Sequence, residues 1–336
     1  MFFSRSSHEI GAIFYPLGTH GNRNWWEHGD RVDAARDSLV DDMSGYEGPV
    51  HVWKDLERDV FPILDGMDFD YICLGNGTDP AHKALAQRYG TNKVLFSEYG
   101  WLPWSGHFYI SRGGAGFDSE IARMDEHDVS RFGIDRDNIE SFQGGLPRGA
   151  DFEYEDFLYV PLQKDVNDFK FLYSRFADNM EFIRFIDGIV PPGVKVLLKC
   201  HPLYKQKYDL SFSNRLIDIT NDNLDKAALY ERMRAMICLN STSVLEALSY
   251  GARVFTYGDD IFVNKGVTYH KVEDQSEFER LLVAEPNPVQ CQKFISLLLG
   301  RQIDRKKCIR SDSEYIFRHY WNLCLGRSPE ECKVIG

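Results

Sequence analysis

The segment AMICLNSTSVLEALSYGARVFTY, residues 235–257, carries the clearest structural signal in this chain of 336 residues. Its apolar run at 235–239 has the length of a buried strand, and the amphipathic segment 244–250 follows with helical spacing. A second apolar run at 253–257 returns as a strand. Strand, helix and strand at this spacing are typical of a βαβ unit, whose two strands lie parallel in one sheet.

The same alternation extends outward in both directions, although the periodicity is weak between residues 99 and 150. Further strands are predicted at 10–16, 50–53, 69–74, 93–96, 157–162, 194–200 and 216–220. Helices are predicted at 32–43, 81–89, 169–189, 224–231, 277–283, 288–299 and 312–324. This order predicts an α/β fold with two Rossmann-like domains facing a central cleft. Ligands in such sheets bind beyond the carboxyl ends of the strands.

The composition excludes several classes of protein. The length corresponds to roughly two domains at about 150 residues each. The net charge of −12, without any basic block, argues against binding to duplex nucleic acid. Seven scattered cysteines without a CxxC pair favour reduced thiols over disulfides or a zinc site. No apolar run reaches the ~18 residues of a membrane span, and the N-terminus lacks the apolar core of a signal peptide. We therefore expect a cytoplasmic location.

Two strand ends of the second half carry groups suited to bind an anion. Lys199-Cys200-His201-Pro202 closes the strand 194–200, and its imidazole and ammonium groups are donors for a phosphate or a carboxylate. Asn240-Ser241-Thr242-Ser243 precedes the helix 244–250, where hydroxyls and free N–H groups gather. An ordinary surface histidine and a simple Ser/Thr helix cap are the alternatives. Because both loops fall in one half, on strands expected to be neighbours, a phosphate pocket is favoured.

Carboxylates at two other positions are candidates for catalysis. Glu98 follows the predicted strand 93–96 within Glu98-Tyr99-Gly100-Trp101, a position suited to general acid or base work, although a solvated turn glutamate is the alternative. Gln163-Lys164-Asp165-Val166-Asn167-Asp168 ends the strand 157–162, and Asp168 there also suits the N-cap of the next helix. Glu246, in the first turn of the helix 244–250, either binds a ribose or interacts only with the dipole of its own helix. The chain lacks GxxxxGK[ST], GxSxG and HExxH motifs.

Taken together, these motifs resemble those of the retaining β-Kdo transferases of bacterial capsule and O-antigen synthesis. KCHP and NSTS are similar to the HP and Ser/Thr motifs that hold CMP in this family and in related bacterial sialyltransferases. Glu98-Tyr99-Gly100-Trp101 resembles its E-x-G-[FW] element, and Pro161-Leu162-Gln163 through Asp168 resembles its P-x-Q…D segment. LEALSYGARVFTYGDDIF matches a further run of the family pattern. The resemblance spans about residues 94–262.

The resemblance implies a GT-B fold and a metal-independent enzyme that uses CMP-Kdo as its donor. It assigns residues 1–163 to an acceptor domain, 164–310 to a CMP-sugar domain, and 311–336 to a helix that crosses back to the first domain. In this scheme Glu98 is the acid/base, and Asp168 or Asp165 is the nucleophile. The donor site comprises Gln163, Lys199, His201, Pro202, Ser241, Thr242, Ser243 and Glu246.

The partners implied are a CMP-sugar, a saccharide or glycolipid acceptor and neighbouring glycosyltransferase modules, at the inner face of the membrane. The loose spacing between Gln163 and the two aspartates leaves the covalent adduct open. Two other functions remain compatible with the sequence. One is an inverting sialyl or nonulosonate transferase, which needs Glu98 and no aspartate nucleophile. The other is a non-catalytic nucleotide-binding domain with the same fold.

Overall fold

The computed structural model describes residues 2–3, 10–14, 50–52, 61–66, 71–75, 77, 80–90, 92–102, 106–150, 154–164, 173–202 and 206–304. These residues form two compact units. The N-terminal unit contains the described residues up to 100, residues 106–120 and residues 302–304. The C-terminal unit contains residues 121–301 where they are described, together with 101–102.

The N-terminal unit is built on a seven-stranded sheet with the order β13-β6-β5-β4-β1-β2-β3. Its strands are β1 (Phe2–Phe3), β2 (Ile10–Phe14), β3 (Val50–Val52), β4 (Tyr71–Leu74), β5 (Val94–Tyr99), β6 (His107–Ser111) and β13 (Ile303–Asp304). The sheet is mixed, because β1 runs antiparallel to both neighbours and β6 runs antiparallel to β5 and β13. The sequence predicts a parallel Rossmann-like sheet here, and only the pairs β4–β5 and β2–β3 are parallel.

Two helices pack against the middle of this sheet. In α2 (Phe61–Asp65) the buried side chains are Phe61 and Leu64, and in α3 (Pro80–Tyr89) Leu85 is buried. These side chains form one apolar cluster with β4 and β5. The helix α3 ends at Gly90, whose φ of +83° is left-handed and favours glycine, as the sequence predicts.

The C-terminal unit is built on a six-stranded sheet with the order β12-β11-β10-β7-β8-β9. Its strands are β7 (Phe157–Pro161), β8 (Lys195–Lys199), β9 (Leu216–Asp218), β10 (Met233–Cys238), β11 (Val254–Thr256) and β12 (Tyr269–His270). Every pair of neighbours is parallel, so the carboxyl ends of all these strands meet at one edge. The parallel sheet predicted from residues 235–257 is therefore confirmed.

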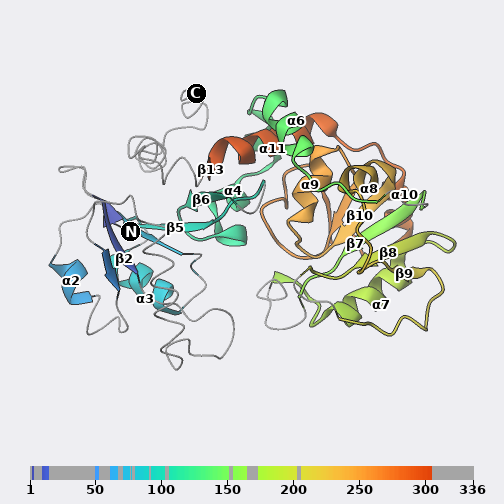
Figure 1. Cartoon of the computed structure of the whole chain (residues 1–336), viewed down its shortest axis with the longest axis horizontal. Coiled ribbons are helices and arrows are strands. Elements are labelled where there is room, and N and C mark those ends of the chain that lie inside the picture. Colours follow the sequence, from blue (N-terminus) through green and yellow to red (C-terminus); the bar gives the residue numbers. More distant parts are fainter. Residues whose placement is uncertain are drawn as a thin grey trace. The chain divides into compact units, whose positions relative to one another are not determined.

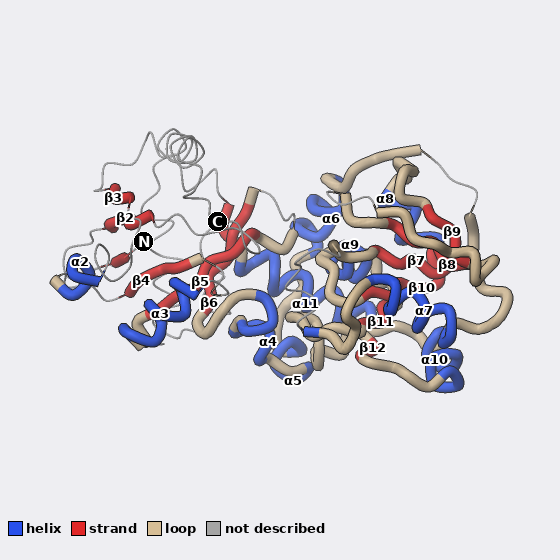
Figure 2. Tube along the Cα trace, turned by 90° about the horizontal axis from the view of Figure 1, so that it is seen from below, coloured by secondary structure: helices blue, strands red, loops and turns tan. Residues whose placement is uncertain are grey.

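Helices cover both faces of this sheet, as Figures 1 and 2 show. One face carries α7 (Asn179–Ile189) and α10 (Gln275–Leu282), and the other carries α8 (Lys226–Arg232) and α9 (Ser243–Ser249). A sheet buried on both faces needs near-continuous apolar strands, which is why the short apolar runs identify them in the sequence.

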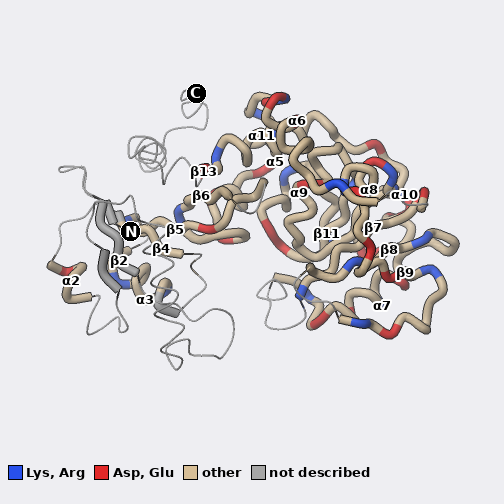
Figure 3. The backbone as a smooth tube through the Cα atoms, viewed as in Figure 1, with Lys and Arg blue, Asp and Glu red and all other residues tan. Residues whose placement is uncertain are grey.

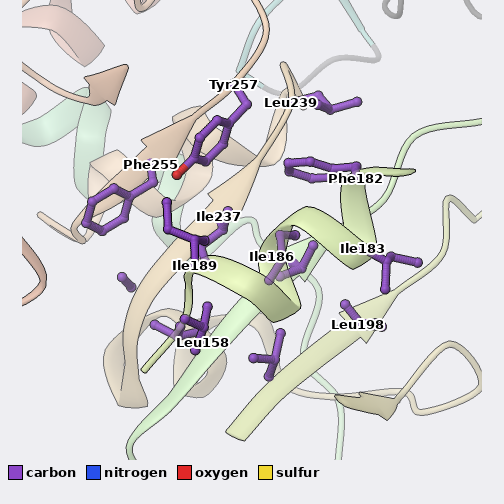
Figure 4. Close-up of a cluster of buried hydrophobic side chains, with 14 of the residues drawn as sticks. Leu158, Phe182, Ile183, Ile186, Ile189, Leu198, Ile237, Leu239, Phe255 and Tyr257 are labelled. Carbon is purple, nitrogen blue, oxygen red and sulfur yellow. The ribbon is translucent and has the colours of Figure 1, made fainter. Parts of the chain in front are cut away.

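The largest core cluster lies between α7 and the strands (Figure 4). Phe182, Ile183 and Ile186 of α7 have no solvent exposure, and they pack on side chains from the central strands. Tyr257 follows β11 and closes the cluster, with its ring centroid 5.9 Å from that of Phe182.

The helix predicted at 169–189 is shorter than the sequence indicates. It begins at Asn179 because Asp178 acts as its N-cap, accepting the N–H of Glu181 at 2.8 Å. Residues 173–178 are not α-helical, and Ser174 Oγ there accepts the N–H of Phe176 at 3.3 Å. The apolar residues before Asn179 therefore follow a helical spacing in the sequence, although the α-helix begins only at Asn179.

The described residues between 121 and 163 belong to the C-terminal unit, although the expected first domain extends to residue 163. They contain α5 (Glu126–Ser130), α6 (Arg136–Gly144) and most of α4 (Glu120–Arg123), and they end with β7 in the middle of the second sheet. Both α5 and α6 pack on α11 (Pro288–Arg301). The ammonium group of the fully buried Lys265 adds a polar link, because it donates to the carbonyls of Ala122 and Met124.

After α11, residues 302–304 return to the N-terminal sheet as β13. The helices predicted at 32–43 and 312–324, and the proposed crossing segment 311–336, lie outside the described residues. Within the described part of the C-terminal unit, acidic and basic residues are interspersed along the chain (Figure 3). Among the helices that the structure describes, none has the length and apolar character needed to span a bilayer.

Candidate functional site

The carboxyl edge of the C-terminal sheet brings three of the predicted loops to one place. Gln163 follows β7, His201 follows β8, and Ser241 follows β10. The sequence predicts that the last two strands are neighbours, and this is wrong, because β7 lies between β8 and β10. Pro161 of β7 pairs with Lys199, and Tyr159 pairs with Met236. Gln163 therefore follows the strand that separates the two predicted anion-binding loops.

Gln163 is held by its backbone while its side chain keeps a donor available. Its N–H donates to Oδ1 of Asn179 at 3.3 Å, and its carbonyl accepts from Nδ2 of Asn179 at 2.6 Å. The side chain is 7% exposed, and its Nε2 has no hydrogen-bond partner among the described residues. A buried amide donor without a partner carries a desolvation cost, so it marks a position where a ligand would supply the acceptor.

The loop after β8 is tied to the neighbouring β9 side. Nζ of Lys199 donates to the carbonyl of Asp222 at 2.6 Å and to that of Ile219 at 3.4 Å. The N–H of Cys200 donates to Oγ1 of Thr220 at 3.0 Å. The ammonium group of Lys199 thus donates hydrogen bonds to backbone carbonyls, which partly satisfy it. His201 is half-buried and Pro202 is exposed at the strand end.

At the start of α9 the Ser/Thr cluster forms a local turn. Oγ of Ser241 accepts the N–H of Ser243 at 3.3 Å. Thr242 is the N-cap residue, but its φ and ψ of −62° and −19° are helical and its side chain makes no capping bond. The hydroxyl of Ser241 therefore performs a capping function, which agrees with the simpler of the two interpretations, while the side chain of Thr242 is exposed.

Glu246 has protein partners for both of its carboxylate oxygens. Nζ of Lys226 lies 2.9 Å from one oxygen and 2.7 Å from the other, and the hydroxyl of Tyr230 donates at 2.5 Å. Burial, followed by the charge of Glu246, raises the pKa of Tyr230 well above its ordinary value, so the phenol keeps its proton. This network joins α8 to α9 and supports the interpretation of Glu246 as a structural residue.

Glu98 lies in the N-terminal unit, in β5, between β6 and β4. It pairs with Tyr109 of β6, and its Oε1 accepts the N–H of Tyr99 at 2.8 Å. Gly100 follows because the strands approach closely: a Cβ atom at this position would lie 2.5 Å from the Cβ of His107. Trp101 is buried. The glycine and tryptophan of the Glu98–Trp101 motif thus have packing roles, and Glu98 is half-buried beside them. Asp165 and Asp168 lie outside the described residues.

Two polar groups near the sheet edge escape the sequence analysis. The first is Asn179, which has no exposure and also donates to the hydroxyl of Tyr208 at 2.9 Å. A polar residue inside an apolar helical pattern, directly after an N-cap aspartate, is the signal that would have identified it.

The second group is a histidine network between β11 and β12. Nε2 of His270 lies 2.9 Å from Oδ1 of Asp259, and its Nδ1 lies 3.1 Å from Oγ1 of Thr256. Burial, and then the charge of Lys271, lowers the pKa of His270. A neutral ring that donates from Nε2 to the carboxylate and accepts at Nδ1 from the hydroxyl satisfies all three groups. No spacing in the sequence points to it.

The architecture of these units is that of the GT-B class: the chain has a GT-B-like fold. Its structure is similar to that of the β-Kdo 2,7 transferase of Thermosulfurimonas dismutans KpsC, with 15% identity and a TM-score of 0.53. That match covers 89% of this chain and 97% of the other. The β-Kdo 2,4 transferase of the same KpsC matches 74% of this chain and 83% of its own, with 13% identity and a TM-score of 0.46.

At the level of sequence, a family model described as "Capsule polysaccharide biosynthesis protein" matches residues 189–289. That range contains the KCHP and NSTS loops. No curated protein matches the chain. The family model covers two of the motifs that carry the resemblance to capsule-associated proteins, and the first structural match shows the fold that this resemblance implies.

Replacing Gln163 and Asn179 should separate ligand binding from stability. In Gln163→Met the free energy of unfolding, from urea titrations, should stay equal or rise by up to about 1 kcal/mol, since a buried donor without a partner is removed. In Asn179→Leu it should fall by about 2–4 kcal/mol, because three hydrogen bonds are lost in the interior. Equal destabilisation by both changes would contradict a ligand-directed role for the Gln163 amide.

Proposed function

We propose that the chain is a glycosyltransferase that transfers Kdo from CMP-Kdo to a saccharide acceptor in capsule polysaccharide synthesis. The reaction retains configuration and gives a β-linked product, and it needs no metal ion. The acceptor belongs to a saccharide or glycolipid made on the cytoplasmic side, where neighbouring glycosyltransferase modules supply and extend it. The family model and the GT-B-like fold support this general activity.

The observation that carries the proposal is the buried Nε2 of Gln163 at the carboxyl edge of a parallel sheet. Its neighbouring strand ends bear His201 on one side and Ser241 on the other. Ligands of open α/β sheets bind at such an edge. An amide donor, an imidazole and hydroxyl groups together suit an oxygen-rich anion such as the phosphate of CMP.

Binding of the anionic CMP-Kdo needs cationic or neutral hydrogen-bond donors at the site, because the chain as a whole is negatively charged. The net charge is −12, and the donor carries a phosphate and a sugar carboxylate. His201, with Gln163 and the exposed hydroxyl of Thr242, stabilises the charge that develops on CMP as it leaves. In this role Lys199 contributes through the local potential, since its ammonium group is directed to backbone carbonyls.

The reacting centre of the donor is a fully substituted carbon, so loss of CMP passes through an oxocarbenium-like state. A carboxylate near this carbon captures it as a covalent adduct, and Asp168 or Asp165 has this role in the proposed mechanism. Glu98 then removes the proton of the acceptor hydroxyl as that oxygen attacks the adduct. Retention follows from the two successive displacements.

The proposal is tested by incubating the protein with CMP-Kdo and a synthetic β-Kdo disaccharide as the acceptor. CMP release and a β-linked trisaccharide, identified by NMR, are expected. An inverted linkage would support the inverting nonulosonate transferase instead. Calorimetry with CMP tests the donor site separately: His201→Ala should weaken binding about tenfold or more, while the exposed His127→Ala in α5 should not. Wild-type protein that binds no CMP would indicate a non-catalytic domain.

Removing the carboxylate of Glu98 should abolish most transfer without affecting the donor site. In Glu98→Gln, turnover to the acceptor should fall by about 10²–10⁴-fold, because a general base is lost, while CMP affinity stays the same. Glu140→Gln, on the exposed face of α6, is the matched control and should keep full turnover. Undiminished turnover by Glu98→Gln would remove Glu98 from the mechanism.

The covalent intermediate should accumulate when its second step is blocked. Intact-protein mass spectrometry of Glu98→Gln with CMP-Kdo should show one added Kdo, because the adduct forms but no base assists its release. Peptide mapping should place the added mass on Asp168 or Asp165, and the corresponding Asn variant should lose it. A Glu98→Gln protein that turns over CMP-Kdo without any added mass would favour the inverting mechanism.

A further inference from the structure

The sheet register of the N-terminal unit gathers polar side chains around Gly100. In the antiparallel pair β5–β6, Glu98 lies opposite Tyr109, and the N–H of Gly100 donates to the carbonyl of His107 at 2.8 Å. Residues that face each other across an antiparallel pair project on the same side, as do alternate residues of one strand. Glu98 and His107 therefore share one face as diagonal neighbours, at a separation of about 7–8 Å.

The third strand adds two more polar groups to this face. Asp304 of β13 pairs directly with His107. Gln302 is buried just before β13, and a Cβ atom at Gly100 would lie 3.1 Å from its Oε1. Gly100 thus lies where His107 and Gln302 approach the strand closely, and Glu98 lies on the same face, two residues earlier in β5. The four polar residues come from positions 98, 107, 302 and 304, which only the fold brings together.

One nitrogen of the His107 ring has its hydrogen-bonding capacity unsatisfied within the described part of the chain. Its Nδ1 is buried without a hydrogen-bond partner among the described residues, while the residue as a whole is half-buried. A structural histidine normally donates and accepts through both nitrogens. Here Nδ1 keeps its hydrogen-bonding capacity, while Cβ of the residue packs against Gly100. The residue lies on the same sheet face as the carboxylates of Glu98 and Asp304, which accept hydroxyl donors.

We propose that His107, with Gln302 and Asp304, forms a subsite for the hydroxyl groups of the acceptor sugar and positions the attacking hydroxyl beside Glu98. This inference rests on the proposed transferase function and extends it to the acceptor. Carboxylates that accept and an imidazole and amide that donate match a polyol, whose hydroxyls do both. The two carboxylates disfavour a sugar carboxylate at this position, so the subsite faces the hydroxyl-bearing side of the acceptor.

The test separates acceptor binding from donor chemistry. With the β-Kdo disaccharide as acceptor, His107→Ala should raise the acceptor KM by about three- to tenfold, the loss of one hydrogen bond. The slow release of CMP from CMP-Kdo in water alone, and the affinity for CMP, should not change. His107→Gln, which retains a donor, should recover part of the loss, and Asp304→Asn should raise the acceptor KM while keeping donor hydrolysis. His127→Ala is the matched control.

Saturation-transfer NMR of the disaccharide gives a readout that does not depend on turnover. Signal transfer from wild-type protein, reduced in His107→Ala, is expected even if CMP-Kdo proves not to be the donor. The subsite is overturned if wild-type protein shows no saturation transfer, or if His107→Ala leaves the acceptor KM unchanged. It is also overturned if CMP affinity falls in parallel with acceptor binding, since that would reveal a general structural defect. Failure of donor turnover alone contradicts only the proposed function.

Discussion

The contact between Asn179 and the backbone of Gln163 organises the polar edge of the C-terminal sheet. The oxygen of the Asn179 carboxamide accepts the N–H of Gln163, and its nitrogen donates to the Gln163 carbonyl. The side chain thus binds both backbone groups of Gln163, as a neighbouring strand would. The contact is buried, so it is strong, and it uses only the main chain of Gln163, which leaves the side-chain amide without a role in it. Because β7 lies between β8 and β10, the same contact fixes the position around which His201 and Ser241 are arranged.

The two units place their chemistry differently. In the C-terminal unit, polar groups follow parallel strands and meet at one edge of the sheet. In the N-terminal unit, Glu98 and His107 lie within antiparallel strands, on a face rather than an edge. In the proposed function, the loops at the edge would bind the nucleotide, and the paired strands would give Glu98 the fixed geometry that proton transfer requires.

Local patterns in the sequence predict many of the individual strands and helices. The order and pairing of the strands depend on contacts between distant residues, which these patterns do not show. The βαβ unit at 235–257 is predictable because buried parallel strands are short apolar runs, and His201 and Ser241 follow from the position of strand ends. The position of β7 between their strands is not, since periodicity carries no information on strand order. The pairing of His107 with Asp304 joins residues far apart in the chain, and only the register shows it. The mixed pairing of β1 is hidden for the same reason.

The late return of β13 has a consequence for synthesis of the protein on the ribosome. The outer edge of β6 is complete once residue 111 has been made, but its partner strand begins only at Ile303. At about 5–20 residues per second, that edge stays open for roughly 10–40 s while the whole C-terminal unit is translated. An unpaired edge is a template for association with other chains. The growing polypeptide therefore has a period in which chaperones, or the early folding of the second unit, must keep neighbouring copies apart.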